Sequence, residues 1–340
     1  MTVQRRTLSL VAGVLALFAI APGEAWAQST SSTSTQPSSS TQAAWTVAQD
    51  GTGRFKTIQA AVNAVPHLTK LDNQTHVISV KAGTYREVVY VQREKRFVKL
   101  LGEDPATTII TYNLSAGMVG LDGEKIGTFR TPTVYIDADD FACENLTFEN
   151  SAGRVGQALA IRIDGDRVAF KNCVFKGYQD TILGNRGRHY FEKCAIFGAT
   201  DFIFGAATEW YENCKIVCIG SGYISAASTP ETVPYGFVFH QCKIGASAPE
   251  NRTFLGRPWR GFASTIYLDC ELDDNVRSEG WNNWGDPKRE KTARYSEFNS
   301  TGPGAGTGNR TVWSKQLTAT EAAAITRQNV LDGWDPTQAK

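Results

Sequence analysis

The sequence has almost no net charge and few histidines, and both features exclude some classes of function. Its 340 residues include 35 Lys and Arg against 34 Asp and Glu. Nucleic-acid-binding proteins normally carry a clustered basic surface, so no nucleic-acid partner is expected. The four histidines (His67, His76, His189 and His240) have no metal-ligand spacing. There is also no G-x-S-x-G motif to support a Ser-His-Asp esterase. We expect neither a metal nor a cofactor.

Long apolar runs are missing except near the N-terminus. There, Arg5 and Arg6 precede an apolar run from Leu8 to Ala21, and the segment ends in Ala25-Trp26-Ala27. This order is typical of a secretory signal peptide, and the run is short for a membrane span. An N-terminal anchor is the alternative, but no membrane association is expected. The sequence therefore predicts export (extracellular or periplasmic) after cleavage near Ala27.

The rest of the chain divides by composition into two parts. Residues 28–43 are almost all Ser, Thr, Gln and Pro, which is typical of a flexible linker. Residues 44–340 have a globular composition and form the expected catalytic domain. Removing residues 1–27 takes away two Arg and one Glu, which leaves 33 basic and 33 acidic residues. An acidic substrate would therefore have to be recognised by local contacts.

One short pattern recurs along this domain: an aromatic residue, two further residues, a cysteine, one residue, and an apolar residue. The copies are centred on Cys173, Cys194, Cys214, Cys242 and Cys270, with a looser copy at Cys143. Alternating apolar positions around each cysteine indicate short strands, and the closest repeats leave no room for a helix. The pattern predicts an all-β fold, a parallel β-helix. A propeller is the competitor, but its blades need about forty residues or more.

The ends of a β-helix expose strand edges, which must be covered. Residues 55–65, stopped by Pro66, predict a short amphipathic helix at the N-terminal end. Residues 317–325 predict a second helix at the other end. A solenoid with capped ends gives no reason to expect more than a monomer.

The repeated cysteines allow two interpretations. Equivalent strands of neighbouring coils place Cα atoms about 4.8 Å apart, within the range that a disulfide tolerates. Cys194–Cys214 is the candidate bridge. The alternative is a reduced ladder, in which each cysteine acts as a small apolar side chain.

Two aspartates stand at the same position of consecutive repeats. Asp180 and Asp201 each lie seven residues after a cysteine, so we expect them on one face, about one strand spacing apart. Paired carboxyls at that distance can separate their pKa values and divide acid and nucleophile roles. Taken alone, an Asp after a strand is most often a turn residue.

The sequence around these acids resembles the pectinesterases (pectin methylesterases). The resemblance extends from about Trp45 to Trp334 and includes several motifs in the same order. The matching segments are Gly83-Thr84-Tyr85-Arg86-Glu87, Gly156-Gln157-Ala158-Leu159-Ala160, Gly177-Tyr178-Gln179-Asp180-Thr181, Asp201-Phe202-Ile203-Phe204-Gly205, Leu255-Gly256-Arg257-Pro258-Trp259, Gly280-Trp281-Asn282-Asn283-Trp284 and Gly302-Pro303-Gly304-Ala305. The resemblance implies a single-stranded right-handed parallel β-helix with short capping helices. It also implies hydrolysis of methyl esters of polygalacturonate to pectate and methanol, as in enzymes of class EC 3.1.1.11.

The resemblance also implies roles for individual residues. Asp201 is the expected nucleophile, Arg257 its partner and Asp180 the general acid and base. Gln157 and Gln179 are the expected oxyanion donors. The expected substrate contacts are Thr128, Gln157, Arg257, Trp259, Tyr178, Phe202 and Trp281, with Trp284 as a further candidate. Trp259, Trp281 and Trp284 could instead be core residues, because aromatics fill cores as readily as platforms. Tyr85 and Glu87 are expected to be scaffold.

Two rival functions remain at this point. One is another β-helix pectin enzyme, either a galacturonan hydrolase or a calcium-dependent lyase. The other is an adhesin or carbohydrate-binding protein without chemistry. Two clustered acids accompanied by Gln donors favour ester hydrolysis.

Overall fold

The structure is a computed structural model that describes residues 45–67, 74–250 and 252–338. The expected signal peptide (1–27) and linker (28–43) lie outside the described residues. Among the helices of the described part, none has the length and apolarity needed to cross a membrane.

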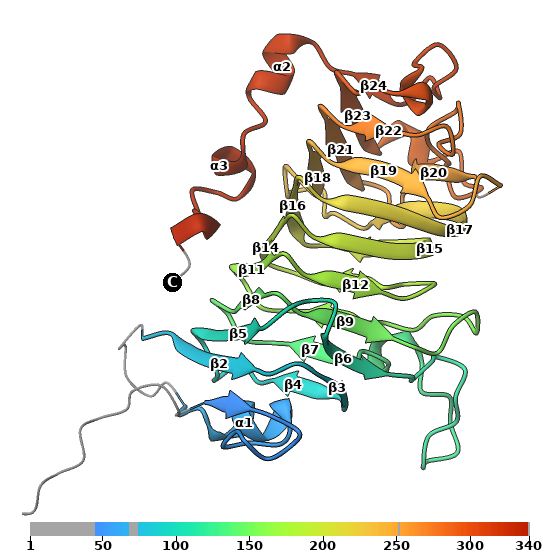
Figure 1. Cartoon of the computed structure of the whole chain (residues 1–340). Helices are drawn as coiled ribbons and strands as arrows, with labels where there is room; N and C mark the ends of the chain where they lie inside the picture. Colours follow the sequence, from blue (N-terminus) through green and yellow to red (C-terminus); the bar gives the residue numbers. More distant parts are fainter. Residues whose placement is uncertain (1–44, 68–73, 251, 339–340) are drawn as a thin grey trace, which may run out of the picture. The chain divides into compact units, whose positions relative to one another are not determined.

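The described chain forms the predicted right-handed parallel β-helix, with strands stacked in three ladders and all named strand pairs parallel (Figure 1). The first ladder contains β1 (Thr46–Val47), β2 (His76–Val80), β5 (Val98–Gly102), β8 (Ala142–Glu144), β11 (Val168–Lys171), β14 (Arg188–Glu192), β16 (Thr208–Glu212), β18 (Phe237–His240), β21 (Ser264–Leu268), β23 (Arg294–Phe298) and β24 (Lys315–Gln316). Each coil contributes one strand to this ladder and then turns into the other two.

The second and third ladders belong to one sheet, because two long strands run through both. The second ladder contains β3 (Gly83–Arg86), β6 (Thr108–Tyr112), β9 (Thr147–Asn150), β12 (Val174–Lys176), β19 (Lys243–Ala246) and β22 (Glu271–Leu272). The third contains β4 (Val89–Val91), β7 (Val134–Ile136), β10 (Ile161–Ile163), β13 (Ile182–Gly184) and β20 (Thr253–Gly256). The long strands β15 (Ala195–Gly205) and β17 (Lys215–Ala227) join the two ladders.

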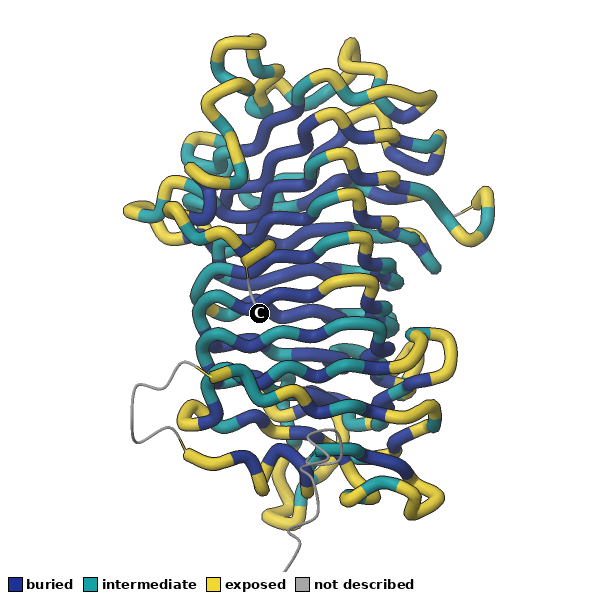
Figure 2. Tube along the Cα trace, turned by 60° about the vertical axis from the view of Figure 1, so that its left-hand side comes forward, coloured by how far each residue is buried: buried dark blue, intermediate teal, exposed yellow. Residues whose placement is uncertain are grey.

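The interior is filled by side chains that stack from coil to coil. The aromatic residues of the repeat form one such ladder: the rings of Phe170 and Phe191 lie 5.0 Å apart, and those of Phe191 and Tyr211 4.5 Å apart. Phe239 and Tyr267 continue it at 4.6 and 4.5 Å. Buried positions therefore follow one another up the stack (Figure 2).

A left-handed residue precedes the repeat cysteine in each of five consecutive turns. These residues are Asn172, Lys193, Asn213, Gln241 and Asp269, with φ between 49° and 54°. The positive φ turns the chain sharply from the first ladder into the second, and asparagine tolerates this conformation better than most residues. The turn then directs the cysteine into the interior.

The predicted Cys194–Cys214 disulfide is wrong. All seven cysteines are buried free thiols. Cys194 Sγ donates to the carbonyl oxygen of Glu192 at 3.4 Å, and Cys214 Sγ to that of Phe191 at 3.4 Å. In parallel strands held in register, equivalent side chains point the same way, so neighbouring sulfurs lie side by side without a bond; Cys173 Sγ and Cys143 Sγ, for example, are 3.7 Å apart.

The N-terminal helix is confirmed. Helix α1 (Ile58–Ala64) is capped by Thr57, whose side chain accepts from the Ala60 amide, and Pro66 follows its C-cap. The Glu87 carboxylate accepts from the amides of Ile58 and Gln59, which agrees with the scaffold role expected for Glu87. Tyr85, 1% exposed, is also core.

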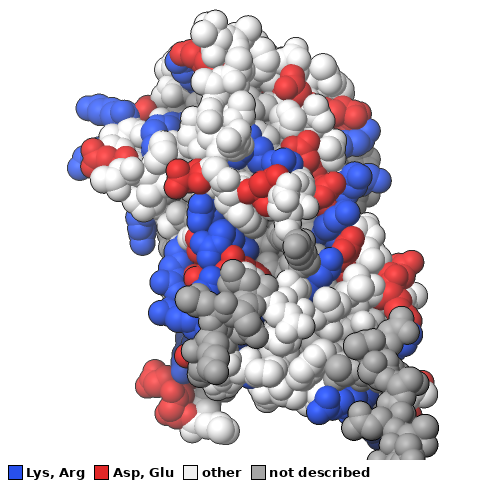
Figure 3. All heavy atoms as spheres, turned by 90° about the vertical axis from the view of Figure 1, so that its left-hand side faces the viewer, with Lys and Arg blue, Asp and Glu red and all other residues white. Residues whose placement is uncertain are grey.

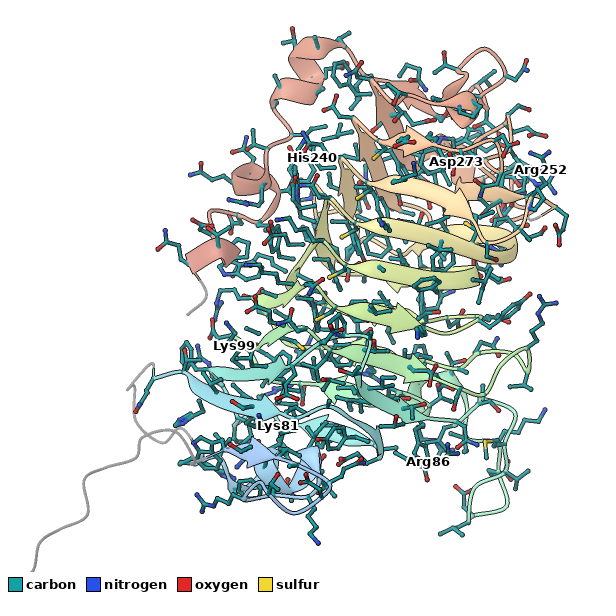
Figure 4. The ribbon with its side chains drawn as sticks, in the orientation of Figure 1. Lys81, Arg86, Lys99, His240, Arg252 and Asp273 are labelled. Atoms are coloured by element: carbon teal, nitrogen blue, oxygen red, sulfur yellow. The ribbon has the colours of Figure 1, made fainter. Side chains whose placement is uncertain are left out.

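The helix predicted over residues 317–325 is confirmed, and a further short helix that was not predicted follows it. The segment with α2 (Ala319–Ala323) and α3 (Arg327–Val330) runs back along the first ladder (Figure 1). Val330 and Leu331 pack on outward-facing Trp210 and Val238. These apolar side chains on the outer face need cover, which explains the position of the segment. Lys99 and His240 lie on this side of the stack, away from Arg252 (Figure 4).

Short 3₁₀ helices complete the structure at Thr128–Arg130, Arg289–Lys291, Pro303–Ala305 and Pro336–Gln338. On the face that carries the C-terminal segment, acidic and basic side chains are interspersed, as expected from the balanced composition (Figure 3).

Candidate active site

The two aspartates lie on adjacent coils, as predicted. Gln179 pairs with Thr200 in parallel register, so the residues that follow them, Asp180 and Asp201, are stacked. The Asp180 amide donates to the carbonyl oxygen of Thr200 at 3.1 Å. Both acids have left-handed backbones, with φ of 62° and 50°. Such conformations are uncommon outside glycine and recur at functional sites.

A pocket of about 310 Å³ opens over these acids. It is lined by Thr128, Phe129, Gln157, Gln179, Asp180, Asp201, Phe204, Ala226, Arg257, Trp259 and Trp284. The structure therefore brings together all five residues expected to be catalytic, and it places two of the expected substrate contacts, Thr128 and Trp259, beside them. Gln157, Asp180 and Asp201 lie on three successive coils, and Arg257 lies two coils beyond Asp201.

Asp201 is held by a two-point ion pair. Arg257 Nε lies 2.8 Å from Asp201 Oδ1, and Arg257 Nη2 lies 2.6 Å from Oδ2. Burial raises the pKa of Asp201 above its ordinary value, while the hydrogen bonds and charge of Arg257 oppose the rise. A bidentate contact of this kind favours the carboxylate form.

Asp180 has a different environment. Only 8% of the residue is exposed, and within the described residues its carboxyl makes no hydrogen bond or ion pair. Burial, followed by the nearby negative charge of Asp201, raises the pKa of Asp180 to about 8, although Arg257 works in the opposite direction. The pair is thus divided into one ion-paired carboxylate and one carboxyl that holds its proton at neutral pH.

The two glutamines stack beside the acids. Gln157, Gln179 and Thr200 occupy equivalent positions on three successive coils. Their backbones are engaged: Ala116 donates to the carbonyl of Gln157, and Ala158 to that of Gln179. Both side chains line the pocket, where their amide groups can donate to an oxygen bound above the acids.

Two of the predicted substrate contacts are wrong. Phe202 is completely buried and Trp281 is 1% exposed, so neither ring can stack on a sugar. Trp281 packs on Tyr267 and Tyr295 and donates from Nε1 to Glu297 at 3.1 Å. Tyr178 is half-buried and lines a neighbouring pocket instead of this one.

Some of the aromatic side chains at the site were not predicted from the sequence. Phe204 faces the pocket and contacts Trp259 edge to face, with ring centroids 5.8 Å apart. The Arg257 guanidinium lies between the rings of Tyr223 and Trp284, 3.7 Å from each centroid. Trp284 was named as a further candidate, and it does line the pocket. Phe204 stood within a matched motif without being singled out, and nothing in the sequence distinguished Tyr223.

Other titratable clusters do not form a second centre of this kind. No group of three or more His, Cys, Asp or Glu residues gathers to hold a metal in the described ranges. His189 is fully buried and lies between Glu209, at 2.9 Å, and the carbonyl of Gly165, at 3.1 Å. His240 contacts Glu212 on the outer face of the first ladder.

Comparisons with known proteins identify the family of this chain. The pectinesterase family model matches residues 44–334. Pectinesterase 31 of Arabidopsis thaliana is 37% identical over an alignment covering 84% of this chain and 91% of the relative. The pectin methylesterase from carrot superposes with a TM-score of 0.80 at 32% identity, covering 87% of this chain and 95% of the carrot protein. A pectin methylesterase in complex with a hexasaccharide gives a TM-score of 0.73 at 28% identity, covering 86% and 98%. This chain belongs to the pectinesterase family.

Proposed function

We propose that this protein is a carboxylic ester hydrolase that removes methyl groups from methyl-esterified homogalacturonan, the pectin polymer. Each turnover releases methanol and leaves a galacturonate carboxylate. Family membership supports this reaction, and so does the hexasaccharide bound by a relative of the same fold. The observation that carries the mechanism is the stacked pair of carboxyls, of which only Asp201 is bound by an arginine.

Asp201 is the nucleophile. A carboxylate oxygen of Asp201 attacks the ester carbonyl carbon, and the carbonyl oxygen becomes an oxyanion. The side-chain amides of Gln157 and Gln179 donate hydrogen bonds to it, as preorganised donors do in other acyl transfers. Glutamine suits this role because a lysine or arginine there would compete for the two carboxylates.

Asp180 moves the proton. When the tetrahedral intermediate collapses, the bond to the methoxy oxygen breaks, and Asp180 gives its proton to that oxygen, so methanol leaves. The ionised Asp180 then takes a proton from the water that attacks the acyl-enzyme. The second collapse frees the galacturonic acid carboxyl, which then loses its proton to the solvent; it also restores the Asp201 carboxylate and leaves Asp180 protonated again.

Trp259, Phe204 and Thr128 bind the substrate around the ester. Trp259 and Phe204 present apolar surface to the sugar rings, and Thr128 offers a hydroxyl at the rim of the pocket. Aromatic surface with a few convergent polar groups is the usual composition of a small-ligand site.

The test is methanol release from highly methylated pectin. We expect Asp201→Ala to abolish it, and Asp180→Asn to reduce it by about 10²-fold or more, as is usual when a general acid is lost. Asp164→Asn is a matched control, because Asp164 is also a buried acid paired with an arginine but lies outside the pocket. Circular dichroism should show that all three variants are folded.

Three results would contradict the proposal. Full activity of the Asp201→Ala variant would show that Asp201 is not the nucleophile. Loss of activity on chelation with EDTA would point to a metal-dependent pectin enzyme. Binding of pectin by the wild type without methanol release would favour a carbohydrate-binding protein.

The proposal also includes export. A pectin polymer is too large to enter a cell, so the enzyme must meet it outside, which agrees with the leader expected in residues 1–27. N-terminal sequencing of the secreted protein should then begin near Gln28.

A further inference from the structure

A buried ion pair lies outside the catalytic pocket, beside the last strands of the solenoid. Arg310 Nε lies 2.9 Å from Glu297 Oε1 and Arg310 Nη2 lies 3.0 Å from Oε2, and the two side chains are 4% and 2% exposed. Neither residue lines the pocket over Asp180 and Asp201. Removing a charge pair from water costs free energy, so such a pair needs further hydrogen bonds to be stable. Those further contacts show which part of the molecule the pair holds.

The Arg310 guanidinium uses all five of its N–H groups. Besides the two bonds to Glu297, Nη1 donates to the carbonyl oxygens of Arg277 at 3.2 Å and Ser278 at 3.0 Å. Nη2 also donates to the carbonyl oxygen of Gly304 at 2.8 Å. The five donors of a guanidinium have a fixed planar arrangement, so one arginine can hold several backbone carbonyls in a single geometry. Arg310 therefore joins β23, which carries Glu297, to the loop that begins at Arg277.

The middle of this loop, residues 277–284, also contacts the pair. Trp281 Nε1 donates to Glu297 Oε1 at 3.1 Å. Gly280 has a φ of 68°, and a Cβ added there would lie 2.6 Å from Arg310 Cδ. Glycine therefore allows both the backbone conformation and the close approach to Arg310 at this point. The loop is thus held through its carbonyls, through Gly280 and through the Trp281 ring.

The same loop binds the backbone that leads to Arg257. The Leu255 amide donates to the carbonyl oxygen of Gly280 at 2.7 Å. The Asn282 amide donates to the carbonyl oxygen of Gly256 at 3.1 Å. Arg257 is the next residue along the chain, so the position of the loop determines where its side chain starts.

The last residue of the loop reaches the Arg257 side chain directly. The Trp284 amide donates to Asn282 Oδ1 at 2.8 Å, and the Trp284 ring centroid lies 3.7 Å from the Arg257 guanidinium carbon. Arg257 in turn contacts both oxygens of Asp201. An unbroken series of contacts therefore joins the buried pair to the nucleophile.

We propose that Arg310 and Glu297 are positioning residues for the reaction. They hold the 277–284 loop so that Trp284 and the Gly256 backbone keep the Arg257 guanidinium opposite both oxygens of Asp201. A displacement of about 1 Å at a reacting group can lower a rate by about 10²-fold, so a loosened loop should be visible in kcat. This inference rests on the proposed function, because it gives the contact between Arg257 and Asp201 a part in ester hydrolysis.

The main test is the variant Arg310→Lys, which keeps the positive charge but loses the planar set of five donors. We expect kcat for methanol release from highly methylated pectin to fall by about 5- to 20-fold, with a smaller change in KM. The acid limb of the kcat/KM profile should move to higher pH, because Asp201 loses part of the cation that favours its carboxylate. All rates are measured well below the melting temperature of each variant.

Arg188→Lys is the matched control. Arg188 Nε and Nη2 lie 2.9 and 2.6 Å from the two carboxylate oxygens of Asp166, and Nη1 donates to the carbonyl oxygens of Leu331 and Asp332. These contacts are of the same kinds, but they hold the C-terminal segment and lie outside the catalytic pocket. Arg188→Lys should lower the melting temperature without changing kcat or the acid limb.

A second variant keeps the test decisive if Arg310→Lys does not fold. Trp281→Phe retains the ion pair and a ring but removes the indole N–H that donates to Glu297. We expect it to lower kcat by about 2- to 5-fold and to move the acid limb in the same direction. Hydrogen exchange adds a measurement that is independent of activity. The amides of Leu255 and Asn282 should exchange faster in Arg310→Lys and at the wild-type rate in Arg188→Lys.

Failure of this inference and failure of the proposed function give different results. If Arg310→Lys lowers the melting temperature but leaves kcat, the acid limb and the exchange rates unchanged, the pair serves stability alone. If Arg188→Lys reproduces the fall in kcat and the shift of the limb, general loss of stability explains both, and the positioning role is wrong. If the wild type releases no methanol, the proposed function is wrong, and the exchange of Leu255 and Asn282 still tests whether Arg310 holds the loop.

Discussion

Asp180 and Asp201 are neighbours in space but differ in their contacts, and the difference predicts the pH dependence. Asp180, with its pKa raised to about 8 by burial and by Asp201, holds its proton below that pH and loses it above. Asp201 must be ionised to attack. We therefore expect kcat/KM to follow a bell-shaped profile with its alkaline limb near pH 8 and its acid limb set by Asp201.

Methanol release measured against pH checks this profile, with an enzyme-free blank for alkaline hydrolysis of the ester. Because the two carboxyls interact, the pKa values read from the two limbs of the profile describe the pair and not either residue alone. A rate that stays constant from pH 7 to pH 10 would contradict the role of Asp180 as the acid.

The rings on both sides of Arg257 predict a second effect of single side chains. Tyr223 and Trp284 hold the guanidinium in the plane that meets both oxygens of Asp201. A desolvated cation–π contact contributes about 0.5–2 kcal/mol, so Tyr223→Ala and Trp284→Ala should each lower kcat roughly 3- to 30-fold. The acid limb of the pH profile should also move to higher pH, since Asp201 loses part of its cation.

Phenylalanine at either position keeps a ring and serves as the matched control, so Tyr223→Phe and Trp284→Phe should retain most of kcat. If the alanine variants change KM alone and leave kcat and the acid limb unaltered, the rings act only as a surface for the sugar.

Among the turns, the left-handed residue before each repeat cysteine allows a prediction on stability. Asn172 and Asn213 occupy this position in two coils, while the coil between them has Lys193 at φ 52°. Asparagine adopts this conformation more readily than lysine. We expect Lys193→Asn to stabilise the protein by about 0.5–1 kcal/mol. Urea denaturation measures the change, and the reverse substitution Asn213→Lys should destabilise by a similar amount.

The interior cysteines predict the response to reductant. Because all seven are free thiols in the structure, thiol titration in denaturant should give seven groups per chain. The melting temperature should be the same with and without reductant. A titration of five, or a fall in melting temperature on reduction, would show that a disulfide forms between neighbouring coils.

The sequence predicts the strands and turns better than the directions of individual aromatic rings. The cysteine repeat identified the coils, and the shared phase of Asp180 and Asp201 gave their register. The sequence could not show which of Phe202 and Phe204 faces the pocket. The left-handed backbone of Asp201 and the register shift between Thr200 and Ile203 break the regular alternation of inward and outward side chains in this strand. Trp281 and Trp284 posed the same difficulty: a bridge to Gly256 fixes Trp281 in the core, and only the fold reveals that contact.

For the complete solenoid, the sequence predicted the architecture but not the path of the C-terminal segment. The outer face of the first ladder carries Trp210 and Val238, which are indistinguishable from interior residues in a list of apolar positions. Only the stacking of strands shows that they point outward, and hence that Val330 and Leu331 lie on them. Long-range packing of this kind leaves no local signal in the chain.

Gln157, Asp180 and Asp201 lie on three successive coils and Arg257 lies two coils further on, and this arrangement has a consequence for partial unfolding. In a solenoid each coil is stabilised mainly by its two neighbours, so the terminal coils open first. Catalysis needs the coils that carry the pocket residues from Thr128 to Trp284, whereas α1 and β24 lie outside that range. In increasing urea, amide exchange should rise first in α1 and β24 while methanol release stays constant, and Ile58→Ala should widen that interval. The reaction thus reports the integrity of the middle of the solenoid and is insensitive to fraying at its ends.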